Sequence, residues 1–255
     1  MPDPLDPRAT PTLAEVQARV VDVEGWLSDD QIQALHEAAR ACPAGGRIVE
    51  IGSFRGRSTI VLASSAPADV EIVAIDPHAG NDRGPQEIEG FAAEAETDNA
   101  VFTRNLAEAG VADRVRHVRA FSDDAHGEVA DPIDVLFIDG AHRFGPARAD
   151  IRDWGRRVAP GGRMLIHDSF SSIGVTLAIL VELLVSPDWR YEGRARSLTA
   201  YRRTHQSPGA RASSAARQLA QLPWFLRNVV LKVLIASGRK RWAQRLGHDG
   251  ETWPY

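Results

Sequence analysis

Residues 47–59 read RIVEIGSFRGRST, and this stretch decides the fold. Its first five residues are a short, largely apolar run, which is typical of a strand buried on both faces of a parallel sheet. Gly52 and Gly56 punctuate the segment that follows, and Ser58 and Thr59 lie in the first turn of an expected helix. Small residues between a strand and a helix let the backbone approach a ligand, and the helix N-terminus offers unpaired N–H groups. We therefore expect a ligand site at this turn.

Outward from this stretch, the chain alternates between short apolar runs and amphipathic segments. Strands are expected at Arg47–Ile51, Glu71–Ile75, Val115–Arg119, Ile133–Ile138 and Arg163–Ile166, with weaker candidates at Trp189–Leu198 and Ala200–Arg202. Helices are expected at Leu13–Val21, Ser28–Ala41, Arg57–Ser64, Glu94–Ala109, Ala147–Val158 and Val175–Leu184. Such alternation implies βαβ units. The sequence therefore predicts an α/β fold, a Rossmann-like open and mostly parallel sheet with helices on both faces.

Charge divides the chain into an acidic body and a basic tail. Residues 1–188 carry 31 acidic and 17 basic side chains, whereas residues 189–248 carry one acidic and 13 basic side chains. Within the tail, Pro223–Ala236 is an apolar helix with basic residues beside it. This pattern fits either a subunit contact or a helix lying on a membrane, and we favour the subunit contact and hence a homodimer. The expected parts are an N-terminal helical extension (1–43), a cofactor-binding core (44–204) and a basic helical tail (205–255).

The composition is that of an ordinary globular protein, with 44% hydrophobic and 25% charged residues in 255. The single cysteine, Cys42, excludes a disulfide framework and fits a reducing cytoplasm. No uncharged apolar run reaches the roughly 18 residues of a membrane span, so no transmembrane span is expected. The tail arginines are dispersed with few aromatic residues between them, which argues against nucleic acid as a partner. Arginine supplies 28 of the 30 basic residues, a bias that suggests a GC-rich, actinobacterial genome.

Acidic residues flank the glycine turn. Asp76 ends the second expected strand, 24 residues after Gly52, where a carboxylate can accept both hydrogen bonds from a ribose diol. Glu50, just before the turn, would suit a cationic amino-acid group. The glycine spacing is G-x-x-x-G, not the G-x-G-x-x-G of dinucleotide-binding folds. A dehydrogenase, or a plain strand–turn–helix, is the alternative interpretation of this segment.

Four segments, VEIGSFRGRST, VAIDPH, DVLFIDGAH and VAPGGRMLIHD, resemble the successive motifs of class I S-adenosylmethionine (SAM)-dependent methyltransferases. They occur in the usual order and cover roughly residues 45–170. The resemblance implies SAM as cofactor, with a ribose contact from Asp76. The other implied cofactor-binding residues are Glu50, Gly52, Ser53, Gly56 and Ser58 near the methionine part, Ser122 and Asp123 beside the adenine, and Asp139. For Ser122 and Asp123, a helix N-cap is the alternative role.

Four ionisable side chains follow two of the expected strands. Asp139 ends the fourth strand, His142 follows three residues later, and His167 and Asp168 end the fifth strand. The carboxyl ends of parallel strands meet at one edge of a sheet, so we expect these groups to lie together beside the cofactor. Carboxylates and imidazoles together suit a divalent metal.

This arrangement resembles the metal-dependent O-methyltransferases that modify sugars in natural products. The resemblance implies catalytic roles for Asp139 and His142, with His142 as general base. It also implies a Mg²⁺ site formed by Asp139, His167 and Asp168. His167 stands where that branch often has Glu, which changes the charge of the site. The residues alone leave other roles open: His142 as a substrate contact, His167 as a buried hydrogen-bonded side chain, and Asp168 as a helix N-cap.

The sequence therefore predicts a SAM-dependent O-methyltransferase that acts on a hydroxyl of a sugar or glycoside. A mycobacterial methylmannose-type oligosaccharide and a glycosylated antibiotic precursor are the candidate acceptors. The alternatives are an O-methyltransferase of phenols or other small-molecule hydroxyls, and a non-catalytic SAM-binding module. Residues 79–98 are polar and glycine-punctuated, and either a mobile lid or a surface loop is expected there.

Overall fold

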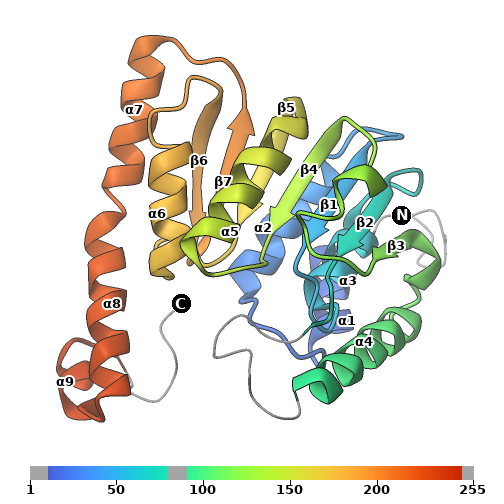
Figure 1. The fold of residues 1–255 in the computed structure, drawn as a ribbon, viewed down its shortest axis with the longest axis horizontal. Coiled ribbons are helices and arrows are strands. Elements are labelled where there is room, and N and C mark those ends of the chain that lie inside the picture. Colours follow the sequence, from blue (N-terminus) through green and yellow to red (C-terminus); the bar gives the residue numbers. More distant parts are fainter. Residues whose placement is uncertain (1–10, 80–90, 249–255) are drawn as a thin grey trace.

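A central sheet dominates the structure, a computed structural model that describes residues 11–79 and 91–248. Seven strands in these residues are ordered β3-β2-β1-β4-β5-β7-β6 (Figure 1). They are β1 (Arg47–Ile51), β2 (Glu71–Ile75), β3 (Val115–Val118), β4 (Ile133–Ile138), β5 (Val158–Ile166), β6 (Trp189–Ala195) and β7 (Leu198–Arg203). The first five pair in parallel, and β7 runs antiparallel to β5 and β6. The predicted α/β class with a mostly parallel sheet is confirmed.

Helices cover both faces of the sheet because successive strand residues point to opposite sides and both sides are apolar. The bounds are α1 (Leu13–Val20), α2 (Asp29–Arg40), α3 (Arg57–Ser65), α4 (Phe91–Glu108), α5 (Phe144–Ala149) and α6 (Ile173–Glu182), with short 3₁₀ turns at Ala112–Arg114, His126–Glu128 and Gly155–Arg157. Buried residues of α1 to α4 pack on one face, and those of α5 and α6 pack on the other.

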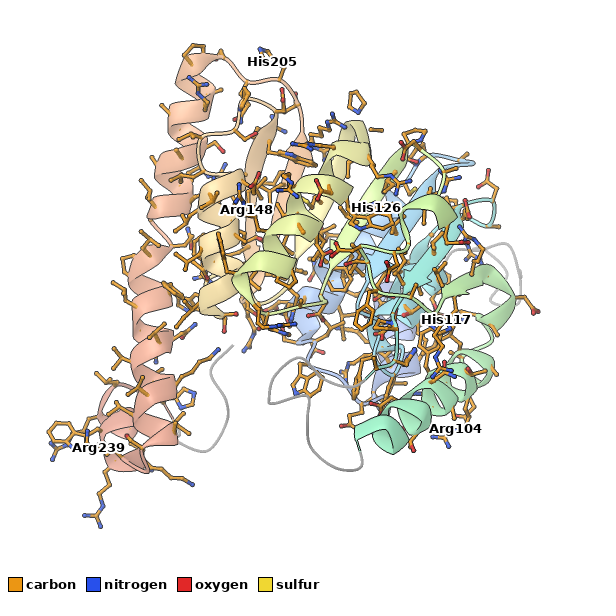
Figure 2. The ribbon with its side chains drawn as sticks, in the orientation of Figure 1. Arg104, His117, His126, Arg148, His205 and Arg239 are labelled. Carbon is orange, nitrogen blue, oxygen red and sulfur yellow. The ribbon has the colours of Figure 1, made fainter. Side chains whose placement is uncertain are left out.

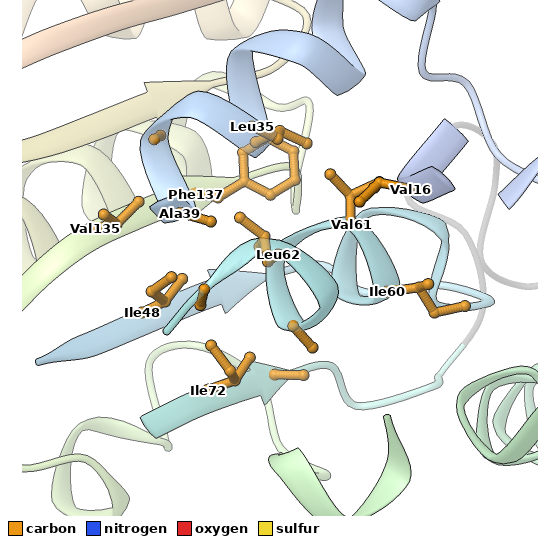
Figure 3. Close-up of a cluster of buried hydrophobic side chains, with 14 of the residues drawn as sticks. Val16, Leu35, Ala39, Ile48, Ile60, Val61, Leu62, Ile72, Val135 and Phe137 are labelled. Carbon is orange, nitrogen blue, oxygen red and sulfur yellow. The ribbon is translucent and has the colours of Figure 1, made fainter. Parts of the chain in front are cut away.

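The first of these clusters joins the N-terminal helices to the sheet. Figure 3 shows Leu35 of α2 and Leu62 of α3 lying over Ile48 of β1 and Phe137 of β4. Each of these side chains is fully buried, and full burial of such a side chain stabilises the fold by about 1.5–3 kcal/mol. The N-terminal helices therefore share the hydrophobic core of the central sheet.

The segment between β4 and β5 differs from the expected single helix over Ala147–Val158. Helix α5 ends at Ala149, a π-helical turn follows at Asp150–Trp154, and β5 already begins at Val158. Pro160-Gly161-Gly162, expected to precede the strand, lies inside it at a shift in the β4–β5 register. Glycine makes this irregularity possible, because a Cβ at Gly162 would lie 2.8 Å from the carbonyl oxygen of Asp134.

Three helices end the described chain: α7 (Pro208–Leu219), α8 (Leu222–Ala236) and α9 (Lys240–Arg245). Helix α7 packs on the edge strand β6, where the Ser214 hydroxyl accepts a hydrogen bond from the Tyr191 N–H at 3.0 Å. Figure 1 shows α8 and α9 continuing past the lower edge of the sheet. The stretch Pro208–Ala236 is long and apolar enough to cross a membrane by length and composition, which is weak evidence of a span. This stretch is not an uncharged run, because Arg211, Arg217, Arg227 and Lys232 interrupt it.

Candidate functional site

The glycine turn after β1 packs directly on the loop after β4. Gly52 has a φ of +86°, and a Cβ at this position would lie 2.3 Å from the carbonyl oxygen of Asp139. The Asp139 N–H donates to the carbonyl of Ile51 at 2.8 Å. Only glycine allows this close approach. The turn and Asp139 are therefore held against each other.

Asp76 ties the end of β2 to the same turn. Its Oδ2 accepts hydrogen bonds from the N–H groups of Ser53 and Phe54, each at 2.8 Å, and its Oδ1 accepts one from the His78 N–H at 2.7 Å. A carboxylate has about four acceptor positions. Three of them thus fix the turn, and capacity for a ligand hydroxyl remains.

Glu50 lies beneath the turn. Its side chain is fully buried and accepts short hydrogen bonds from the hydroxyls of Ser58 and Thr59 on α3. Burial raises the pKa of Glu50 to about 7, and the two hydroxyl hydrogen bonds oppose this rise. Glu50 and Ser58, both expected near the cofactor, therefore contact each other between β1 and α3.

The structure brings Asp139, His142 and Asp168 together at the carboxyl edge of the sheet. One ligand atom from each lies within 4.8 Å of the other two. His142 Nε2 makes a short contact with Asp168 Oδ2. Two carboxylates and an imidazole at this spacing fit a divalent cation that takes oxygen and nitrogen donors.

His167 lies deeper than this cluster. Its side chain is completely buried, and its Nδ1 is 3.0 Å from Asp139 Oδ1 and 3.8 Å from Asp168 Oδ2. The predicted metal ligands were Asp139, His167 and Asp168, whereas the cluster in the structure contains His142 in place of His167. His167 remains a neighbour of both carboxylates.

The start of α6 fixes the loop that carries His142. A Cβ at Gly174 would lie 2.2 Å from the carbonyl oxygen of His142, and the Ser172 hydroxyl donates to that same oxygen at 3.3 Å. Ser172 is also the N-cap of α6, so Asp168 does not have the alternative role of helix N-cap. The local sequence does not show that Gly174 supports the site, because His142, the residue that it contacts, lies more than thirty residues earlier in the chain.

Ser122 and Asp123 lie in the turn after β3, and the next helical turn has Ala125 as its N-cap. Asp150, which was not among the predicted site residues, lies beside them and is only 2% exposed. Burial, followed by the nearby charges of Asp123 and Asp153, raises the pKa of Asp150 to about 7, and a hydrogen bond with Ser122 opposes the rise. A Cβ at Gly140 would lie 3.6 Å from Asp150 Oδ2. Asp150 therefore connects the Ser122 turn to the Asp139 loop.

The raised pKa of Asp150 has a measurable consequence for stability. Because this pKa lies above the ordinary value of 3.8, the folded protein binds more protons than the unfolded chain between about pH 4 and 7, and stability falls as pH rises through this window. Asp150→Asn removes this titration and keeps a hydrogen-bonding group for Ser122. The free energy of unfolding of the variant should exceed that of the wild type by about 1–4 kcal/mol at pH 8, measured by urea denaturation. A difference between the two proteins that does not change with pH would contradict the buried, protonated state.

Comparisons with known proteins agree with this geometry. Residues 49–169 match the family model described as a methyltransferase domain, a span that runs from β1 to the residue after Asp168. The fold is similar to cofactor-bound Rv0187 from MTB, with 23% identity, TM-score 0.54, and 76% of this chain and 90% of that chain covered. It is also similar to TomG from Streptomyces achromogenes, an O-methyltransferase in complex with SAM (21%, 0.52, 75% and 87%), and to the O-methyltransferase NovP (17%, 0.56, 70% and 81%).

The family match and the fold agree with the sequence motifs. Residues 49–169 match a methyltransferase domain, and the fold is similar to those of the SAM-bound O-methyltransferase TomG and of NovP.

Proposed function

We propose that the protein transfers the methyl group of SAM to a hydroxyl oxygen of a sugar or glycoside. The observation that carries this proposal is the cluster of Asp139, His142 and Asp168, which directly adjoins the glycine turn through the contact between Gly52 and Asp139. A sugar hydroxyl is a weak acid, so methylation at its oxygen benefits from a base and from a cation near the developing negative charge. The O-methyltransferases TomG and NovP, which share the fold, support oxygen as the acceptor atom.

SAM supplies the electrophilic methyl group, and the protein residues position the acceptor and move its proton. His142 is the proposed general base. Nε2 would donate its proton to the carboxylate of Asp168, so Nδ1 is the nitrogen that would accept the proton of the substrate, and the carboxylate would stabilise the resulting imidazolium. Holding the hydroxyl and the methyl group together in the right orientation accounts for much of the expected rate.

Asp139 and Asp168, with an imidazole from His167 or His142, provide the donors that would hold Mg²⁺. Bound there, the ion would stabilise negative charge on the acceptor oxygen. The donor set fits, because the two carboxylates are the hard oxygen ligands that Mg²⁺ prefers. A histidine that binds the metal cannot at the same time accept the proton, so the two roles require two different imidazoles.

The proposed cofactor contacts surround the turn after β1. Asp76 would bind the ribose, and Ser122 and Asp123 would flank the adenine. Gly52, Ser53 and Gly56 would contact the methionine part through their backbone. Glu50 and Ser58 would support the turn from below, since each already hydrogen-bonds to the other.

Removing the Asp76 carboxylate should weaken SAM binding by about 1–3 kcal/mol, because a charged acceptor for the ribose hydroxyls is lost. Calorimetric titration of Asp76→Ala with S-adenosylhomocysteine measures this change. Asp76→Asn is the matched variant, since its amide oxygen can still accept hydrogen bonds from the turn. An unchanged affinity in both variants would contradict the ribose contact.

Incubation with labelled SAM and a panel of acceptors, with and without EDTA, tests the proposed activity. Methylation of glycosides, including methylmannose-type oligosaccharides or glycosylated antibiotic precursors, is the expected result. Methylation of phenols alone would favour the second candidate function, a methyltransferase for small-molecule hydroxyls. SAM binding without turnover on any acceptor would favour a non-catalytic SAM-binding module. We propose a cytoplasmic location, which the free and buried Cys42 supports.

We also propose a homodimer, and helix α6 offers the surface that supports it. Its exposed apolar side chains recur every four residues: Ile173, Leu177, Val181 and then Val185 just beyond the helix. This stripe is uncharged, so two copies can pair it without repulsion. Light scattering should show a dimer for the wild type and a monomer for Leu177→Asp, whereas Val21→Asp, at an exposed site on the N-terminal segment, should stay dimeric. A monomeric wild type would contradict the proposal.

A further inference from the structure

The helices α8 and α9, residues 222–246, form an arm whose outer face is apolar. Leu226, Val230 and Val233 recur at helical spacing on α8 and are 61%, 47% and 60% exposed. On α9, Trp242 and Leu246 are also exposed, at 56% and 47%. Monomeric globular proteins seldom leave so many large apolar side chains together in water. We therefore expect the exposed apolar face of the arm to bind a partner.

The charged residues of the arm itself, over residues 222–246, are all basic. From Gly193 to His248 the chain contains 12 basic residues and no acidic residue. Arg239, Lys240, Arg241 and Arg245 gather at the end of the arm, and Figure 2 shows Arg239 projecting from its tip, away from the sheet. An apolar face bordered by cations, with an exposed Trp, is the pattern of a helix that lies in the headgroup region of a membrane.

The other side of the arm is attached to the body. Leu231 and Asn228 are buried, and the Lys232 ammonium donates to the hydroxyl and the carbonyl of Ser171, at 2.9 and 3.0 Å. These contacts would be lost if α8 crossed a bilayer. They are kept if the arm lies on the surface of the bilayer with Leu226 and Val233 facing the lipid.

We propose that the arm docks this methyltransferase on an anionic membrane surface. Two copies meeting through the arm would bring together two cationic surfaces that contain no acidic residue, and this repulsion disfavours self-association at this site. An anionic lipid surface complements the same charges. Residues 1–192 carry 32 acidic and 18 basic side chains, so the body is repelled by the membrane while the arm is attracted. Ser171 lies three residues after Asp168, so docking would bring the catalytic edge close to the membrane.

Co-sedimentation with vesicles tests this proposal. The protein should bind vesicles of phosphatidylcholine mixed with phosphatidylglycerol, bind vesicles of phosphatidylcholine alone much more weakly, and dissociate as salt is added. Lys240→Ala/Arg241→Ala should weaken binding roughly fivefold for each charge removed. Leu226→Ser/Val233→Ser should weaken it roughly tenfold or more, since the apolar contact is lost.

A matched control removes two exposed arginines from the body instead. Arg104→Ala/Arg156→Ala should bind anionic vesicles as the wild type does, and all variants should keep their affinity for S-adenosylhomocysteine. No binding to phosphatidylglycerol vesicles, or equal losses in the arm and control variants, would overturn the proposal. Dissociation of a dimer by Leu226→Ser/Val233→Ser in light scattering would also overturn it, because a second copy would then cover the arm.

Discussion

His142→Ala should lower turnover about 10²–10⁴-fold while the affinity for SAM stays nearly unchanged. His142 lies on the loop after β4, and its Nε2 contacts Asp168. The proposed SAM contacts lie instead on the glycine turn, on Asp76 and on the Ser122 turn. Loss of the imidazole therefore removes a proton acceptor and leaves the cofactor pocket in place. Steady-state rates with labelled SAM and calorimetry with S-adenosylhomocysteine measure the two quantities separately.

Two further variants make this result specific. His205, labelled in Figure 2, lies on the segment between β7 and α7, and its side chain is 82% exposed. Because β7 runs antiparallel to β5, this segment follows the edge of the sheet opposite the cluster. His205→Ala should therefore keep full activity. Asp168→Asn keeps a hydrogen-bonding group beside His142 but removes the charge that stabilises the imidazolium, so it should also be slow. Full activity in His142→Ala would mean that another group removes the proton.

The parallel core was predictable because its signals are local. Strands β1, β2 and β4 have the expected bounds, since a strand buried on both faces reads as a short apolar run between turn residues. Helix α7 lies in the helical tail expected over residues 205–255, but its bounds were not predicted. Its buried side chains, Ser214 and Gln218, are polar, so buried apolar residues do not mark where it begins and ends. Element bounds could thus be predicted from the sequence where the buried side chains are apolar, and could not be predicted where a helix packs through polar side chains.

Some residues of the candidate site could likewise be predicted from the sequence, and others could not. Asp139, His142 and Asp168 were expected together because the ends of parallel strands converge at one edge. Asp150 could not be recognised, since its burial depends on a π-helical turn and on contact with Ser122 from another segment. Nor could the sequence show which of the two histidines, His142 or His167, joins the cluster with Asp139 and Asp168. Both follow strand ends, and only the fold places His142 at the cluster and His167 behind it.

EDTA should lower the turnover of the wild type about 10²–10³-fold, and added Mg²⁺ should restore it, because a bound cation contributes several kcal/mol of charge stabilisation. Asp139→Ala and Asp168→Ala should be about as slow as the EDTA-treated wild type and should not respond to Mg²⁺. Each removes one carboxylate of the cluster. Calorimetric titration with Mg²⁺ gives a readout independent of turnover, and both variants should lose the binding that the wild type shows.

The same titration separates the base from the ligand. If His142 is only the base, His142→Ala binds Mg²⁺ normally yet turns over slowly, and His167→Ala loses metal affinity because His167 Nδ1 lies 3.0 Å from Asp139 Oδ1. If His142 is a ligand, His142→Ala loses metal affinity and His167→Ala keeps it, and the proton must pass to another acceptor such as water. A wild type that binds no Mg²⁺ and is indifferent to EDTA would contradict the metal site. In that case a slow His142→Ala would still identify the base, since the contact with Asp168 requires no metal.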